Sequence, residues 1–288
     1  MSRELDVKNT MALIAGMNIP PAPAILQKVH AELQRDEPQL ATIANLIASD
    51  VGLSALVLKT INSPFFSLRA PVRSIQHATS MLGLGNTINI VAGLALMRSL
   101  DDGRSDEKLW ETPLLVAKIA AAIARRFPGI SADEAYMIGL FHNAGQILMG
   151  QHFDAYPAFQ RDHAGASAAD TITEEDRVFR TNHAVVGYFL GRTWGLERPV
   201  CNVIRDHHDT ARRLWEDNPH DPAEKEKLLL AVLKMAEHVE RCYSTGGADP
   251  EWVAIQDHVL GYAGMSQPDF EELRDNLMDM VSTSLQSG

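Results

Sequence analysis

The residues best suited to chemistry are four histidines in the second half of the chain: His142, His183 and the adjacent His207 and His208. Neutral imidazole is a common metal ligand, and bundle metal sites are built from side chains that project inward from facing helices. Each histidine also has a plainer explanation as a hydrogen-bonded core residue or as a favourable charge near a helix C-terminus. Together they predict a histidine pocket, to which a late helix could add Glu237.

The residue that follows His142 limits what this pocket could do. A His-Asp pair can hold metal, because imidazole supplies a neutral nitrogen and a carboxylate supplies an anionic oxygen that can bridge two ions. Here Asn143 follows His142. An amide oxygen carries no formal charge, whereas Mg²⁺ and Mn²⁺ depend on carboxylates for affinity. We therefore expect no two-metal hydrolytic centre, no catalytic residue and no required cofactor. A single Zn²⁺ or Fe²⁺ held by the four histidines stays open.

The elements that must position these residues are predicted to be helices throughout. Apolar residues repeat with helical spacing in almost every segment, and none alternates convincingly over strand lengths. Ser131 and Glu134 have the spacing of a capping box, which marks the start of an apolar helix that carries His142 through 135–149. The other predicted helices span about 24–33, 38–48, 51–61, 74–82, 86–97, 106–127, 182–194, 199–208, 222–243, 250–262 and 268–285.

A polar connection over 99–106 divides the chain into two halves. We predict an all-α, two-lobed helical bundle, although one long bundle with a soft boundary at this connection stays open. One domain would span 15–245, with an N-terminal lobe at about 15–98 and a second lobe at about 106–245. Residues 246–288 would form a C-terminal helical extension.

Composition excludes several classes of function. The formal net charge is -11, with 26 basic and 37 acidic residues and no Lys/Arg block, so nucleic acid is a poor candidate partner. The chain has no signal-peptide pattern and no window near eighteen uninterrupted apolar residues, so we expect a soluble cytoplasmic protein without a membrane partner. Cys201 and Cys242 form no CxxC motif, and we expect them to be free thiols.

Two further motifs are weaker. A glycine pair at Gly83 and Gly85 precedes a helix, but no strand comes before it, so a plain turn is predicted rather than a phosphate loop. Phe65 and Phe66 follow a helix stop at Pro64. These two aromatic residues could fill the interface between the lobes, or one of them could be exposed as part of a partner-binding surface.

The order of these motifs resembles the HD phosphohydrolase superfamily. The N-terminal half is similar more specifically to the HDOD family, the HD-related output domain of bacterial signalling proteins. The resemblance covers roughly residues 15–245. It is carried by Ile19-Pro-Pro-Ala-Pro23, Ile47-Ala-Ser-Asp50, Leu58-Lys-Thr-Ile-Asn-Ser63, Ser74-Ile75 with Ala78, Leu82-Gly-Leu84, Gly139-Leu-Phe-His-Asn-Ala-Gly145, His183 with Gly187, Trp194-Gly-Leu196 and His207-His208.

The resemblance implies that the second lobe is HD-like and that the protein acts in bacterial signal transduction through protein contacts. HD hydrolases carry an early histidine, a His-Asp pair and a late aspartate. This chain has Thr112 near the first position, Asn143 in the pair and at best Glu237 at the last. These departures imply a non-catalytic regulatory module with a vestigial pocket, formed by His142, Asn143, His183, His207, His208 and Glu237.

Several alternatives stay open at this point. The vestigial pocket could bind a small molecule or an anion. The chain could instead be a metal-dependent phosphohydrolase or phosphodiesterase with an altered ligand set, or a structural dimer whose pocket is only core. The sequence names no partner, no input signal and no oligomeric state.

Overall fold

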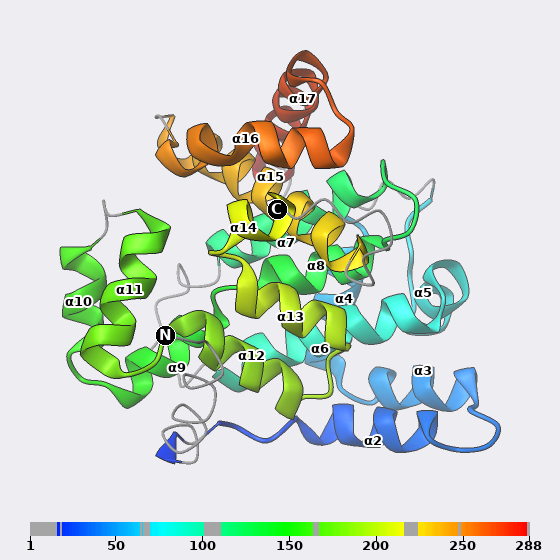
Figure 1. Cartoon of the computed structure of the whole chain (residues 1–288). Coiled ribbons are helices and arrows are strands. Elements are labelled where there is room, and N and C mark those ends of the chain that lie inside the picture. Colours follow the sequence, from blue (N-terminus) through cyan, green and yellow to red (C-terminus); the bar gives the residue numbers. More distant parts are fainter. Residues whose placement is uncertain are drawn as a thin grey trace.

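The computed structural model describes residues 16–17, 19–63, 65, 70–100, 111–163, 167–215, 224–246 and 249–286. Within these residues the regular elements are helices and no strand occurs, which confirms the all-α prediction (Figure 1). In chain order they are α2 (Ala24–Leu33), α3 (Leu40–Ala48), α4 (Val51–Ile61), α5 (Ile75–Leu82), α6 (Leu84–Leu100), α7 (Glu111–Ala124), α8 (Ala132–Phe141), α9 (Ala144–His152), α10 (Tyr156–Asp162), α11 (Ala168–Phe179), α12 (His183–Thr193), α13 (Arg198–Asp206), α14 (Thr210–Trp215), α15 (Glu224–Thr245), α16 (Pro250–Ala263) and α17 (Gln267–Gln286).

Two of the N-terminal helices, α4 and α5, begin where the sequence supplies a side-chain cap. The Leu53 N–H donates to Asp50 Oδ1 at 2.9 Å at the start of α4, and the His77 N–H donates to Ser74 Oγ at 3.1 Å at the start of α5. These bonds satisfy backbone donors that a helix leaves free at its first turn. The predicted turn between α5 and α6 is confirmed at Gly83, whose φ of 82° suits glycine.

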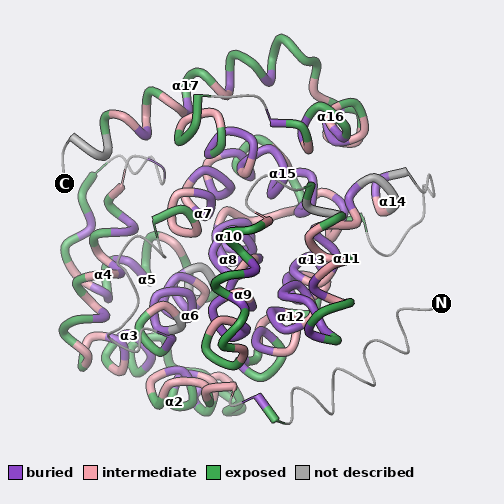
Figure 2. Tube along the Cα trace, turned by 90° about the vertical axis from the view of Figure 1, so that its left-hand side faces the viewer, coloured by how far each residue is buried: buried purple, intermediate pink, exposed green. Residues whose placement is uncertain are grey.

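The core gathers around α8, which packs against α7, α6, α13 and α15. Figure 2 shows buried positions concentrated on the inward sides of these helices and of α12. The approach of α7 to α8 is close because Gly139 has no side chain. A Cβ added at this glycine would lie 2.5 Å from Ala117 Cα and 2.7 Å from its backbone nitrogen. Small residues at this crossing therefore set the distance between the two central helices.

The helix predicted over 135–149 is not continuous, so this part of the prediction is wrong. α8 ends at Phe141 and α9 begins at Ala144, which leaves His142 and Asn143 in the break. The His142 ring nitrogen Nδ1 lies 2.8 Å from Gly139 O. This side chain thus competes for a backbone carbonyl near the end of α8, which favours termination there. The break turns both residues toward the same pocket.

The sequence analysis did not predict three of the helices, α10, α11 and α14. Figure 1 shows α10 and α11 side by side at the left of the molecule. Aromatic rings pack the two helices together. The Phe179 ring at the end of α11 lies 4.9 Å from the Phe153 ring, which precedes α10, and 5.4 Å from the Tyr156 ring in α10, measured between centroids. The sequence of α11 is mostly polar, so its apolar stripe is too short to stand out as a periodic pattern.

The prediction that Phe65 could belong to an exposed partner-binding surface is wrong. Its ring is 1% exposed and lies in the hydrophobic core, where burial removes a large apolar area from water. Phe66 lies outside the described residues, as does most of the predicted boundary at 99–106. The proposed lobe limits stay predictions. The predicted extension contains α16 and α17, and both pack on α15.

No single helix of the described chain has both the length and the apolar composition of a membrane span. The helices α3 and α4 reach that composition only when they are taken together, and they are bent by 108° where they meet.

The crossing of α7 and α8 leads to a stability prediction. We expect Gly139→Ala to lower the free energy of unfolding by about 1–3 kcal/mol or more, because the new methyl group meets backbone atoms of Ala117 that cannot move independently. Gly150→Ala in α9 is the matched control, since its nearest neighbour would be Tyr156 Cδ1 at 3.9 Å. There, alanine should stabilise the helix by about 0.5–1 kcal/mol. Urea unfolding measures the free energy of unfolding of both variants. Equal changes in the two variants would contradict the close approach of α7 and α8.

Candidate functional site

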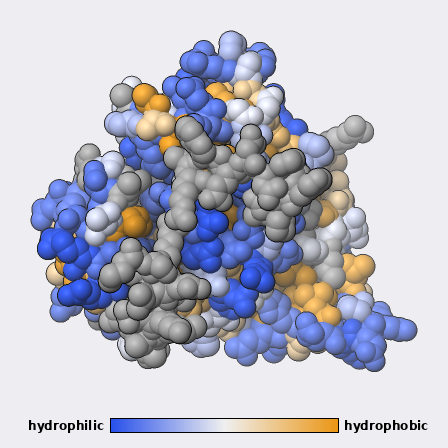
Figure 3. Space-filling model, in the orientation of Figure 1, coloured by the Kyte–Doolittle hydropathy of each residue, from blue (hydrophilic) through white to orange (hydrophobic). Residues whose placement is uncertain are grey.

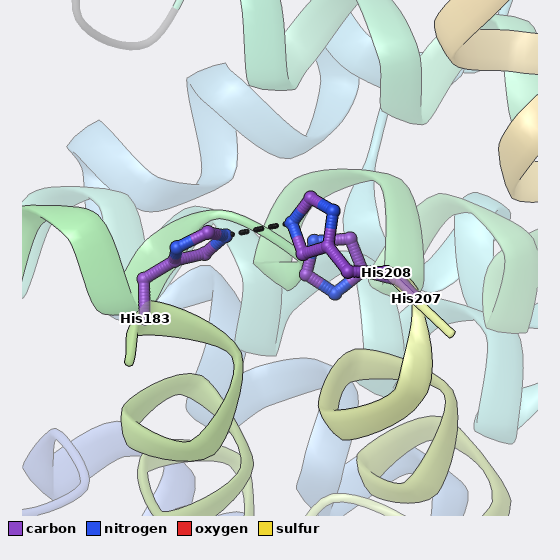
Figure 4. Close-up of side chains that lie close together, drawn as sticks. All are labelled: His183, His207 and His208. Atoms are coloured by element: carbon purple, nitrogen blue, oxygen red, sulfur yellow. Dashed lines mark hydrogen bonds between the residues drawn. The ribbon is translucent and has the colours of Figure 1, made fainter. Parts of the chain in front are cut away.

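Three of the predicted histidines form a compact cluster. His183 opens α12, whereas His207 and His208 follow the last residue of α13, and the rings converge between these helices (Figure 4). One nitrogen from each ring can be chosen so that all three lie within 4.8 Å of one another. The shortest separation joins His183 Nε2 and His208 Nε2 at 2.9 Å. The arrangement brings nitrogen donors from two elements to one point.

His183 is oriented by Glu175 on α11. The imidazole Nδ1 lies 2.8 Å from Glu175 Oε2, and the backbone N–H of His183 donates to the same oxygen at 2.9 Å. The Tyr156 hydroxyl donates to Glu175 Oε1 at 2.6 Å. Burial works to raise the pKa of the Glu175 carboxyl, but His183 and Tyr156 outweigh it and hold that pKa below its usual value. The carboxylate therefore binds Nδ1, and Nε2 faces His208 within the cluster, where it could act as a ligand.

His207 and His208 each carry a buried nitrogen without a hydrogen-bond partner. His207 Nδ1 lies 2.7 Å from Ile204 O, which leaves its Nε2 unpaired, and His208 Nδ1 is also unpaired. Burial lowers the pKa of both rings well below 6.5, and the nearby Lys234 adds to this effect. Both rings are therefore neutral near pH 7. Leaving a buried polar atom unpaired costs about 1–3 kcal/mol of folding free energy. A ligand bound to the two unpaired nitrogens would remove this cost.

His142 lies beside this cluster with its own partners. Its ring centroid is 5.4 Å from that of His207. Its Nε2 lies 2.8 Å from the Asn143 amide nitrogen and 3.3 Å from Glu237 Oε1. Burial lowers the pKa of His142, while the Glu237 charge opposes the shift. The amide that replaces the expected aspartate thus occupies the ring nitrogen that would otherwise bind metal.

The sequence analysis missed Lys234, which lies one turn before Glu237 on α15. The Lys234 side chain is 2% exposed, and its Nζ lies 2.9 Å from Glu237 Oε2 and 2.7 Å from Glu251 Oε1. Burial by itself would lower the pKa of this ammonium group, but the two carboxylates outweigh burial and raise it. A fixed positive charge therefore lies within the pocket. Its spacing of three residues from Glu237 on one helix was the signal that could have identified it.

A cavity of about 110 Å³ opens beside His142. The helix α16 forms one side of it, because Asp249 caps this helix and Glu251 and Trp252 belong to it. Four carboxylate residues and two cationic residues share the wall, so its charge disfavours an anion. Burial raises the pKa of the Glu240 carboxyl, although hydrogen bonds from Ser244 and Thr112 oppose the shift. The lining residues are Thr112, Val116, His142, Asn143, Lys234, Glu237, Glu240, Arg241, Asp249, Glu251, Trp252 and Ile255.

Comparison with known proteins identifies the family. The family model described as the HDOD domain matches residues 19–210. This chain belongs to the HDOD family. Its relatives include an uncharacterized protein of Treponema pallidum, 28% identical over 228 residues, and YuxH of Bacillus subtilis, 25% identical over 118 residues. These matches cover 75% and 41% of this chain, but 41% and 29% of the relatives, so the HDOD chain spans less than half of their length.

Solved structures share this HDOD fold. An HDOD domain protein of Geobacter sulfurreducens is 23% identical, with 98% of this chain and 97% of that chain covered and a TM-score of 0.67. A protein of Shewanella amazonensis provisionally named a phosphohydrolase is 20% identical, with 95% of each chain covered and a TM-score of 0.68. A protein of Marinobacter aquaeolei provisionally named a signal transduction protein is 23% identical, with 94% and 60% covered and a TM-score of 0.64. At these identities the likeness concerns the fold.

The residues of this HDOD chain do not fit a two-metal centre. Asn143 offers an amide instead of a bridging carboxylate, Thr112 stands on the cavity wall near the expected early histidine, and Lys234 already neutralises Glu237. A single transition metal fits better. Two imidazole nitrogens in the three-histidine cluster are buried and unpaired, and a carboxylate orients the third ring.

The neutral histidines lead to a pH prediction. The unfolded chain binds a proton at His207 below about pH 6.5, whereas the folded chain resists it because its pKa is lowered. The free energy of unfolding should therefore fall as the pH drops below about 6.5, by at most about 1.4 kcal/mol per pH unit from this residue. In chelator-treated protein, His207→Gln should make the dependence between pH 7 and pH 5 shallower. The exposed His152→Gln is the control, and a slope unchanged in both variants would contradict a neutral His207.

Proposed function

We propose that this chain is a non-catalytic regulatory module of bacterial signal transduction that acts in the cytoplasm through protein contacts. The observation that carries the proposal is the buried ammonium of Lys234, ion-paired with Glu237 within the vestigial HD pocket. The amide of Asn143 on His142 supports it. In this proposal the pocket is kept as a ligand-sensing or structural element and no longer as a reaction centre.

The charge of Lys234 opposes the reaction of a two-metal hydrolase. The ammonium group is paired with both Glu237 and Glu251, so a metal ion would have to displace it to reach these carboxylates. Glu237 offers little compensation, because its carboxylate is already paired with the ammonium group. The four carboxylate residues of the cavity wall also disfavour a phosphate substrate. A ligand of this cavity would accordingly be neutral or cationic.

A phosphodiesterase assay tests the absence of catalysis. With Mn²⁺ added, we expect the wild-type protein to hydrolyse bis(p-nitrophenyl) phosphate no faster than buffer alone, because a second metal ion is excluded. Metal analysis of the same sample should give at most one transition metal per chain. The variant His142→Ala serves as the matched control for site-specific turnover. Two metals per chain, together with turnover that this variant abolishes, would establish the phosphohydrolase alternative instead.

We further propose that His183, His207 and His208 can hold one Zn²⁺ or Fe²⁺. The support is the pair of unpaired nitrogens on the adjacent histidines and the carboxylate of Glu175 behind the third ring. Imidazole nitrogens suit a transition metal better than Mg²⁺ or Ca²⁺. Such an ion would act as a Lewis acid when bound, and its charge would satisfy the free nitrogens.

Thermal unfolding tests this metal site. After treatment with a chelator and its removal, added Zn²⁺ should raise the Tm of the wild-type protein, because an ion that binds only the folded state stabilises it. The gain is about 2.7 kcal/mol when the free ion is at 100 times its Kd. The shift should disappear in His207→Gln and persist in His152→Gln, whose side chain is exposed. An equal shift in both variants, or none in the wild type, would reject the three-histidine site.

An apolar surface on the N-terminal helices supports the proposed protein contacts. Leu40, Val51 and Met81 are 53%, 80% and 45% exposed, and they belong to α3, α4 and α5, which pack against one another. Figure 3 shows hydrophobic side chains gathered on this part of the molecule, at the lower right. With Phe65 buried, these helices offer a better candidate surface for a partner than the aromatic pair.

A further inference from the structure

A second group of reactive side chains lies on α15, apart from the histidine cluster. The Sγ atom of Cys242 is 3.5 Å from Nε2 of His238. The other ring nitrogen of His238, Nδ1, lies 3.0 Å from Asp249 Oδ2. The imidazole therefore contacts the thiol through one nitrogen and the carboxylate through the other. This is the order of a nucleophile, its general base and the acid that orients the base.

The fold locks the imidazole in this orientation. Cys242 lies one turn after His238 on α15, so the two side chains share a face. Asp249 caps α16 by accepting the Trp252 N–H at Oδ1, 3.3 Å away, which directs its other oxygen to the imidazole. The Trp252 ring stacks on His238 with centroids 4.5 Å apart and planes 15° apart. The imidazole consequently presents Nε2 to the sulfur.

The two thiols of the chain differ sharply in their surroundings. Cys242 is half-buried, and burial raises the pKa of its thiol, with Arg274 opposing the shift and Asp249 adding to it. The thiol thus stays protonated near neutral pH and needs a base to become a nucleophile. Cys201 is fully buried, and its thiol donates to Leu196 O at 3.6 Å. Of the two cysteines, only Cys242 is both partly accessible to solvent and in contact with an imidazole.

We propose that Cys242 is a thiol-modification site that reacts with small disulfides, with His238 as its general base and Asp249 as a positioning residue. The thiol proton moves to His238 Nε2 while the sulfur bonds to one sulfur atom of the disulfide. The disulfide bond breaks, and the other half leaves as a thiolate that takes the proton back from the imidazolium. Cys242 is oxidised to a mixed disulfide, and the departing half is reduced to a thiol.

The site lies where such a change would affect the C-terminal helices. α15 packs against both α16 and α17, which Figure 1 shows stacked above it. The acid that orients the base caps α16, and the ring stacked on the base belongs to the same helix. A mixed disulfide on Cys242 would therefore add bulk beside the surface on which these helices dock.

The reaction with dithiodipyridine tests the proposal, since this neutral disulfide is not repelled by the nearby carboxylates. In a Cys201→Ser background, the release of thiopyridone should follow a single phase that disappears when Cys242→Ser is added. His238→Gln should slow this phase by about 10- to 100-fold, in keeping with general-base catalysis. Asp249→Asn should slow it less, and Asp249→Glu should retain more of the rate than Asp249→Asn.

Two measurements separate this chemistry from a purely structural effect. Loosened packing would expose the thiol and raise the rate, whereas loss of the base lowers it, so the direction of change is decisive. Added imidazole should restore part of the rate in His238→Ala, and the Tm of each variant establishes that it is folded. The proposal is overturned if Cys242 in the folded protein reacts no faster than in the urea-unfolded chain at the same pH. It is also overturned if the His238 and Asp249 variants react at the wild-type rate.

Discussion

The burial of the Lys234 ammonium is the physical constraint on which the pocket and the packing of α16 against it depend. A charge removed from water is costly unless opposite charges and hydrogen bonds surround it. In this chain Glu237 on the same helix and Glu251 on α16 supply them. The need to compensate one charge thus joins α15 to α16. It also helps to keep His207 and His208 neutral, because the ammonium disfavours their protonation.

The site has two regions with different chemistry. On one side, His183, His207 and His208 present imidazole nitrogens, and their rings are oriented by Glu175 and by a backbone carbonyl. On the other side, the wall of the cavity beside His142 includes four carboxylate residues, Lys234 and Arg241. A phosphohydrolase needs metal ions and an anionic substrate in one place. Here the three-histidine cluster does not line the cavity that holds the four carboxylates, which supports the proposal that the HDOD site is regulatory.

Local sequence signals predicted much of the helical framework. Helices that begin at a side-chain cap, such as those after Asp50, Ser74 and Asn182, start within a residue or two of their predicted positions. Prediction failed where a side chain or a distant element overrides the local pattern. The apolar stretch around His142 reads as one helix, yet the bond from His142 to Gly139 O helps to end α8. α11 was missed because its few apolar residues form too short a stripe.

The sequence by itself determined the helical class, the family resemblance, the four histidines and the amide at Asn143, because these depend on residue identity and on spacing along one helix. Only the tertiary structure decided that Glu175 orients His183, that Glu251 reaches Lys234 and that Phe65 is buried. The first two contacts join residues on different helices, and the last depends on how several helices pack. Periodicity shows which face of a helix is apolar, but packing between helices decides which charged and aromatic groups meet there.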